Sequence, residues 1–283
     1  MPEPNSSTTN QLAQVTESLR NLWERGPEVT DLPEFDQLVT MRSSLEDQLR
    51  LRPSSQQVVD FLDQGDVAAA TATIEGTGST QTVLDEYLWT LLDIAYLGRD
   101  GEIFTSDHLG DFMAIAGPAT TYVGTVLAGL PNSGLTPAEL TMKERCAEIL
   151  HNIASFTLPD DGLASPADMA AGLSAALRAL QVREELGDTA TIMRANWMVG
   201  NHYRKVDDLD KAEQHLTTAV NLADTLADPV GIAWGKTYLA DVKRAQDPST
   251  ASRLESEAGE AMGQVEDENF MIEWLRIQQR IGA

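Results

Sequence analysis

The chain has 283 residues, of which 42% are hydrophobic and 23% are charged, and it carries a formal net charge of −24 and a single cysteine. This composition is ordinary for a soluble globular protein, and the length suffices for one elongated domain or two compact ones. The negative charge argues against a nucleic-acid partner and against an anionic membrane surface, because the long-range field repels both. A single cysteine rules out an internal disulfide framework and favours a reducing compartment, so we expect a cytoplasmic protein.

The first ten residues are polar and acidic, with neither a basic start nor an apolar stretch after it. They predict a disordered lead-in over 1–10 and no signal peptide. No apolar run approaches the ~18 residues typical of a membrane span, so we expect no membrane partner.

Residues 11–160 predict a helical N-terminal section, because apolar residues recur there at helical spacing between Gly and Pro breaks. A weak helical hairpin is expected over 54–74, turning at Gly65 and Asp66. The other expected helices are 11–25, about 33–52, 82–97, 107–116, 119–130 and 137–156. Residues 157–165 predict a linker. Alternating strand patterns are nearly absent, so the sequence indicates an all-α fold.

A repeat motif becomes visible over 193–223, which predicts two helices joined by a tight turn at Asp207 and Asp208. The motif combines an aliphatic-Gly pair, a tyrosine, and small residues spaced along the second helix: Val199, Gly200, Tyr203, Ala212, Leu216 and Ala219. This stretch resembles one tetratricopeptide repeat (TPR). Gly200 has no Cβ, so we expect the second helix to approach it closely.

The same features recur about 40 residues apart over 166–283. The recurring groups are Leu186-Gly187-Asp188 with Leu226-Ala227-Asp228, Ile192 with Ile232 and Ile272, Trp234 with Trp274, and the small pairs Gly172/Ala179, Ala212/Ala219 and Ser252/Gly259. A spacing of 40 resembles a long-linker TPR variant, with a closing helix near 269–280. The predicted architecture is an α-solenoid of TPR-like helical hairpins behind the helical N-terminal section, because one repeat cannot bury its apolar face alone.

The resemblance also points to a candidate ligand groove. In the TPR family, the first helices of successive repeats line a concave surface where peptides dock. The positions on that surface here are Arg194, Trp197, Met198, Asn201, Arg204 and Lys205 in one repeat, and Trp234, Tyr238, Asp241 and Arg244 in the next. Asn201 matches an asparagine that binds the ligand main chain in carboxylate-binding members. The alternative is that the tryptophans pack between repeats and the charges are solvated.

The groove implies a non-catalytic scaffold that binds a protein or peptide segment, with aromatic anchors and basic residues that favour an acidic ligand. A regulatory sensor, whose repeats bind a signalling peptide and relay a conformational change, is the alternative. An unrecognised active site in the N-terminal helices is a third.

Catalytic and metal-binding motifs are weak in this sequence, so we predict no enzyme, no cofactor and no metal. Glu148 and His151 have a spacing found in di-iron proteins, but no second copy exists to complete such a site. We therefore expect His151 to be a solvated or capping side chain. Cys146 lies near Lys143 and Arg145, yet a buried, unreactive helical cysteine is the favoured interpretation.

Overall fold

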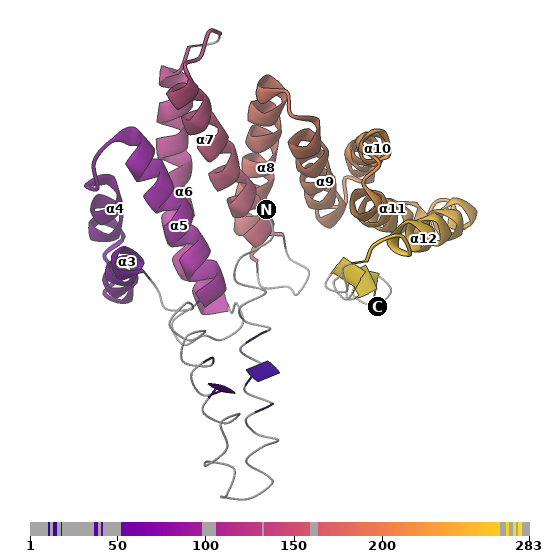
Figure 1. Cartoon of the computed structure of the whole chain (residues 1–283), viewed down its shortest axis with the longest axis horizontal. Helices are drawn as coiled ribbons and strands as arrows, with labels where there is room; N and C mark the ends of the chain where they lie inside the picture. The colour runs from indigo at the N-terminus through magenta and orange to yellow at the C-terminus, as the bar shows by residue number, and fades with distance from the viewer. Residues whose placement is uncertain are drawn as a thin grey trace, which may run out of the picture.

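The computed structural model describes residues 52–97, 106–131, 133–158 and 164–266, together with a few positions nearer the termini (11, 14, 15, 18, 37, 38, 41, 270, 271, 274, 275, 277 and 278). Within these residues the chain is all-α and has no strand. The helices stand side by side in an arch from α3 to α12 (Figure 1). The predicted lead-in over 1–10 and most of the predicted helices over 11–25 and 33–52 lie outside the described residues.

Five helices make up the first half of the arch. They are α3 (Pro53–Asp63), α4 (Val67–Glu75), α5 (Thr80–Leu97), α6 (Ser106–Gly129) and α7 (Pro137–Phe156). The predicted hairpin is confirmed: Gly65 takes a positive φ of 71°, and the Asp66 side chain accepts the Ala69 N–H to begin α4. The helix predicted over 137–156 is also confirmed, and a reciprocal Thr136–Glu139 capping box begins it.

The expectation of two short helices broken at Pro118 was wrong, because α6 runs through this proline as one helix. Proline removes one helical hydrogen bond, which favours a break. Here Phe112 and Ile115 before the proline and Ala119 after it are all fully buried, so packing holds both halves on one axis. Part of this helix, His108–Gly129, is long and apolar enough to cross a membrane by composition, a test that core helices of soluble proteins also pass.

The second half of the arch contains α8 (Pro166–Leu186), α9 (Thr189–Lys205), α10 (Leu209–Leu226), α11 (Pro229–Arg244) and α12 (Pro248–Met262). Each of the last four begins at an aspartate whose carboxylate accepts N–H groups of the first turn; the caps are Asp188, Asp208, Asp228 and Asp247. A carboxylate suits this place because the free N–H groups and the helix dipole both favour negative charge. Asp207 occupies the predicted turn with a φ of 62°.

The predicted close approach at Gly200 is confirmed. A Cβ placed there would lie 2.7 Å from the Leu216 Cγ, closer than real Cβ atoms come to their neighbours. Gly235 meets α10 in the same way, 2.7 Å from the Val220 Cγ2. Glycines on α9 and α11 thus let α10 pack between them.

The predicted small pair Ser252/Gly259 was wrong by one residue. Ser252 is exposed, whereas Ala251 and Ala258 are buried. The reason is that α11 has 16 residues and α9 has 17, which shortens this repeat between its caps. Ala251 and Ala258 therefore take the places of Ala212 and Ala219.

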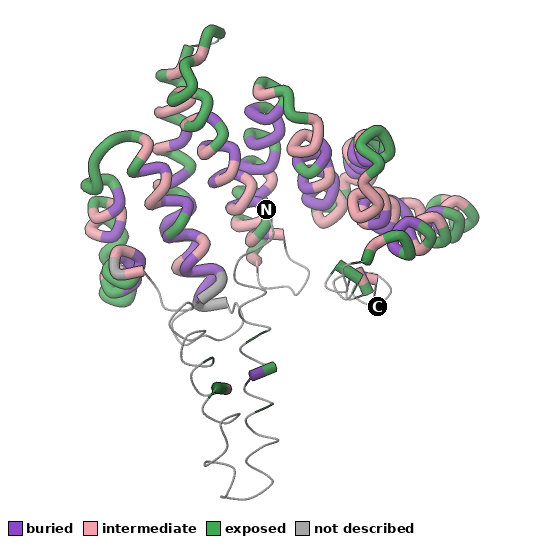
Figure 2. Tube along the Cα trace, viewed as in Figure 1, coloured by how far each residue is buried: buried purple, intermediate pink, exposed green. Residues whose placement is uncertain are grey.

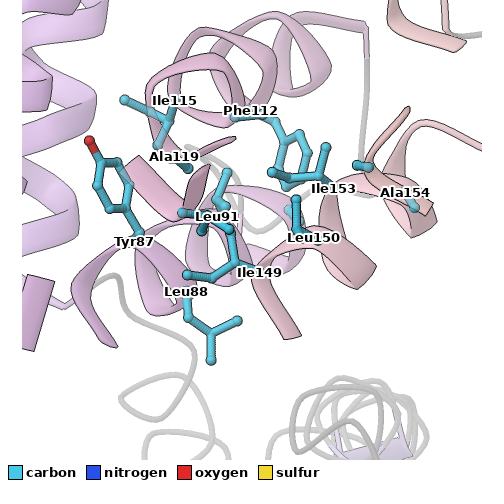
Figure 3. Close-up of a cluster of buried hydrophobic side chains, with 14 of the residues drawn as sticks. Tyr87, Leu88, Leu91, Phe112, Ile115, Ala119, Ile149, Leu150, Ile153 and Ala154 are labelled. Carbon is cyan, nitrogen blue, oxygen red and sulfur yellow. The ribbon is translucent and has the colours of Figure 1, made fainter. Parts of the chain in front are cut away.

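The core continues without a break from the first half of the arch into the second. One cluster of buried side chains runs from Val58 on α3 to Val199 on α9. Its centre is formed by α5, α6 and α7, which contribute the buried Leu91, Phe112 and Ile149 (Figure 3). Buried positions follow the facing sides of successive helices (Figure 2). The described helices α3 to α7 therefore share one core with α8 and α9.

Candidate ligand-binding surface

Four aromatic rings from α9, α11 and the C-terminal residues lie in contact, and we call Trp197, Trp234, Tyr238 and Phe270 the aromatic row. The Trp197 ring centre lies 5.8 Å from that of Trp234 and 5.6 Å from that of Tyr238. Trp234 in turn meets Phe270 edge-on at 6.2 Å. Rings at these spacings stabilise one another beyond the area they bury. The row therefore joins two repeats and the C-terminal residues.

Exposure changes along the row. Tyr238 is buried, Trp197 and Trp234 are half-buried, and Phe270 is 39% exposed. The neighbouring Met271 and Leu275 are also exposed, at 38% and 47%. The Phe270 end of the row is thus an open apolar surface.

The C-terminal residues are fastened to α11 by a hydrogen bond and by packing. The Trp274 indole N–H donates to the Thr237 hydroxyl at 2.8 Å, and Ile277 is buried against the same part of the core as Tyr238. In Figure 1 these residues are yellow and lie beside α11 and α12. Sequence reasoning missed Phe270, because the residue 40 positions earlier is Val230 and the repeat spacing therefore pairs it with no aromatic residue.

Arg204 organises the middle of the predicted groove. Its guanidinium donates to the Asp241 carboxylate at 2.8 Å and to the Asn201 side-chain oxygen at 3.2 Å. It also lies over the Tyr238 ring, 4.9 Å from the ring centre. Arg204 and Asp241, both predicted as ligand-binding charges, are therefore already bonded to each other.

Asn201 and Met198 contribute to the packing of α9. Asn201 is fully buried, and its amide donates to the Trp197 carbonyl oxygen at 3.1 Å. Met198 is 3% exposed. A ligand main chain could reach Asn201 only after the side chains around it moved.

The remaining predicted cations differ in their surroundings. Arg244 is exposed and bonds to Glu255 at 3.0 Å, so its charge is neutralised on α12. Lys205 is half-buried. Arg194 is exposed, and its Nε donates to the Ala190 carbonyl oxygen of its own helix at 3.4 Å. The structure thus brings Trp197, Arg204, Trp234, Tyr238 and Asp241 into contact across α9 and α11, but it buries Met198 and Asn201 and pairs Arg204 and Arg244 with carboxylates.

Two indole N–H groups in the row lack an acceptor in the part of the chain that the structure describes. They belong to Trp197 and Trp234, and both nitrogens are buried. A buried donor without an acceptor costs about 1–3 kcal/mol. A small movement of either ring would therefore be favourable if it brought an acceptor within reach.

Cys146 and His151 are the side chains considered from the sequence for catalysis or metal binding. Among the described residues, no group of three or more metal-binding side chains occurs. Cys146 is fully buried as expected, and burial raises the pKa of its thiol to about 12, so it is unreactive at neutral pH. His151 departs from the expected solvated side chain, because its Nδ1 is buried.

Comparison with known proteins places the chain by fold. No family model matches it, and no curated protein matches it. Among solved structures, it is similar to the crystal structure of BtubC (BKLC) from P. vanneervenii, with a TM-score of 0.50 and 14% sequence identity over 93% of this chain and 94% of that one. At this identity, the likeness extends to the helical fold alone.

Proposed function

We propose that the chain is a non-catalytic scaffold that binds a protein or peptide segment along the aromatic row of α9, α11 and the C-terminal residues. The observation that carries this proposal is the open end of the row. Phe270, Met271 and Leu275 expose apolar surface next to the half-buried Trp234. Aromatic side chains with partly buried rings are the usual anchors of protein interfaces.

The aromatic row could bind a segment mainly through apolar contacts and, in addition, through hydrogen bonds. Ring faces and edges would receive an apolar or aromatic side chain of the segment. The indole N–H groups of Trp197 and Trp234 would gain acceptors if the segment's carbonyl groups displaced the rings slightly. Arg204 and Arg244 would contribute little attraction, because Asp241 and Glu255 already neutralise them.

The test is a selection of peptides from a displayed random library against the full chain. Selected peptides should share an apolar or aromatic residue and should change the tryptophan fluorescence of the protein. A Trp234→Phe variant replaces the indole with a smaller aromatic ring. It should therefore reduce this fluorescence change while preserving the fold. Selection of no peptide above background, or of peptides that leave the fluorescence unchanged, would contradict the proposal.

A further inference from the structure

The described residues after position 269 are helical, and we call them the C-terminal helix. Its described positions are Phe270, Met271, Trp274, Leu275, Ile277 and Gln278. Phe270 meets Trp234 of α11 in the way that Trp234 meets Trp197 of α9. The C-terminal helix thus follows α11 as α11 follows α9, and the row of these helices ends with it (Figure 1).

The C-terminal helix has two apolar sides. Because a helix has about 3.6 residues per turn, Trp274 and Ile277 share one side, whereas Met271 and Leu275 share another. The first side packs against the protein, since Trp274 donates to Thr237 of α11 and Ile277 is buried. The second side is open, because Met271 and Leu275 are both exposed. Apolar residues on more than one side are typical of a helix that is covered on more than one side.

The open side matters because of its place in the arch. In an array of stacked helical hairpins, each repeat is covered by the next one, and the last repeat usually has a polar outer side that keeps the protein soluble. Met271 and Leu275 lie on the last described helix, where such a polar side is expected. Three exposed large apolar side chains therefore fall within residues 270–275, and this end of the arch is uncapped.

The other end of the described arch is polar. On α3, the exposed side chains are those of Gln56, Gln57, Asp60 and Asp63. The Gln56 amide donates to the Asp60 carboxylate at 2.9 Å, one turn along this surface. The apolar residues of the same helix, Val58, Val59 and Leu62, are buried in the core. The α3 end therefore has the polar outer side that the C-terminal end lacks.

We propose that a second copy of this chain covers Met271 and Leu275, so that two molecules associate through their C-terminal helices about a two-fold axis. An open apolar surface is stabilised by contact with another apolar surface. The polar α3 end does not offer one, which disfavours head-to-tail stacking of copies. The C-terminal helix of a second copy does offer one, and a two-fold contact places the same side of both copies face to face.

This inference rests on the proposed function in one respect. The open end of the aromatic row receives a protein partner in both cases, and here that partner is a second copy. Phe270 belongs to the row and to the C-terminal helix, so a bound peptide and a second copy would compete for the surface around it.

The size of the contact and the charge of the protein set the strength of the association. One helix side from each copy buries less than the ~1,200–2,000 Å² of stable complexes, so we expect a reversible dimer with a dissociation constant on the order of micromolar. Each copy also carries a net charge of −24, and the two copies therefore repel each other at long range. Salt screens this repulsion, so added salt should strengthen the dimer.

The first test is sedimentation equilibrium of the full chain over a range of protein concentrations. The average mass should rise from 30.8 kDa toward twice that value as the concentration increases. The dissociation constant should fall at least about threefold when sodium chloride is raised from about 0.05 M to about 0.5 M. A mass that stays at 30.8 kDa, or an association that weakens with salt, would overturn the proposal.

The second test changes the open side itself. Leu275→Gln should raise the dissociation constant at least about tenfold, because a two-fold contact loses one leucine from each copy. Met271→Gln, on the same side, should act in the same direction. The matched control is Leu177→Gln on α8, a leucine that is 38% exposed, and it should change the dissociation constant by less than about twofold. A parent-like dimer in both C-terminal variants would contradict the proposal.

The third test reports the arrangement of the two copies. Cys146 is buried and unreactive at neutral pH, so a Leu275→Cys variant carries one reactive thiol. A short bis-maleimide should link two copies of this variant, whereas Gln56→Cys, on the α3 end, should give no linked dimer. Links between the Leu275→Cys and Gln56→Cys proteins in a mixture would demonstrate head-to-tail contact and exclude the two-fold arrangement.

The outcomes separate self-association from the proposed function. A monomeric protein that binds selected peptides along the aromatic row would remove the second copy and leave the scaffold proposal standing. A dimer that selects no peptide above background would leave self-association and remove the peptide site. A dimer that dissociates when a selected peptide is added would support both, because the two partners then share the open end of the row.

Discussion

The guanidinium of Arg204 on α9 donates to the carboxylate of Asp241 on α11 at 2.8 Å, although the two residues are 37 positions apart in the sequence. Only 10% of the Arg204 side chain and 23% of the Asp241 side chain are exposed. The pair therefore joins the two repeats that carry the aromatic row, in surroundings with less water than a surface ion pair has.

This ion pair should be measurably coupled. A double-mutant cycle with Arg204→Gln and Asp241→Asn should give a coupling free energy of about 1–2 kcal/mol in urea unfolding, above that of exposed pairs and below that of fully buried ones. The matched control is the exposed pair Arg244 and Glu255, which joins α11 to α12 and should give only about 0.2–1 kcal/mol. Equal coupling in the two pairs would mean that Arg204 does not hold α11 against α9.

The close approach of α9 and α10 predicts opposite effects of the same substitution at two glycines. Gly200→Ala places a Cβ 2.7 Å from the Leu216 Cγ and should lower the free energy of unfolding by about 1–3 kcal/mol. Gly124→Ala on α6 meets no atom within 4 Å and should raise it by about 0.5–1 kcal/mol, because alanine favours the helix. Urea denaturation measures both. A Gly200→Ala protein as stable as the parent would contradict the contact.

The ends of α8 and α10 predict a second opposed pair. Both helices end at a left-handed residue, Gly187 with a φ of 81° and Ala227 with a φ of 51°. Glycine adopts this conformation without steric cost, whereas alanine does not. Ala227→Gly should therefore raise the free energy of unfolding by roughly 0.5–1 kcal/mol, and Gly187→Ala should lower it. The melting temperatures of the two variants should shift in the same directions. The same sign of change in both variants would contradict this account of the caps.

Histidine burial predicts that stability falls in mild acid. Burial lowers the pKa of His151 to about 3 and also lowers the pKa values of His202 and His215. The unfolded chain binds protons at these side chains below about pH 6.5, whereas the folded chain keeps them neutral to lower pH. The free energy of unfolding is therefore highest near pH 7 and decreases as the pH falls. His151 alone should account for about 2 kcal/mol between about pH 7 and pH 5.

The measurement is urea denaturation of the parent and of His151→Gln at both pH values. The variant should lose less stability than the parent over this interval. Carboxylates should contribute little there, because lowered pKa values keep Glu139, Asp188 and Asp247 ionised. An equal loss in the two proteins would assign the acid sensitivity to other groups.

Sequence patterns predicted the helices well where local signals agree with packing. The helix over 137–156 carries a proline and a capping box at its start, and its boundaries follow from these residues. Pro118 shows the limit: the local signal predicts a break, but buried neighbours on both sides keep α6 continuous. Register drift at Ser252 has a similar origin, since the length of α11 depends on tertiary packing and no repeat spacing fixes it.

The sequence indicated which helices carry the candidate site, but it did not indicate the partners of the side chains. The helical stripe on α9 and α11 was found from its spacing, and the structure brings Trp197 into contact with Trp234 and Tyr238 across the two helices. Sequence spacing could not reveal that Asp241 neutralises Arg204 or that Asn201 is buried, because both facts depend on which side chains meet across repeats.

The most direct test of the scaffold proposal compares two equally exposed aromatic residues. Phe270 ends the aromatic row and Trp89 lies on α5, and each is 39% exposed. Calorimetric titration of a selected peptide should show that Phe270→Ala weakens binding by about 2 kcal/mol, the loss typical of an anchor residue, whereas Trp89→Ala leaves the affinity within about twofold of the parent. Equal affinities for Phe270→Ala and the parent, or a loss at Trp89 as large as that at Phe270, would contradict the account.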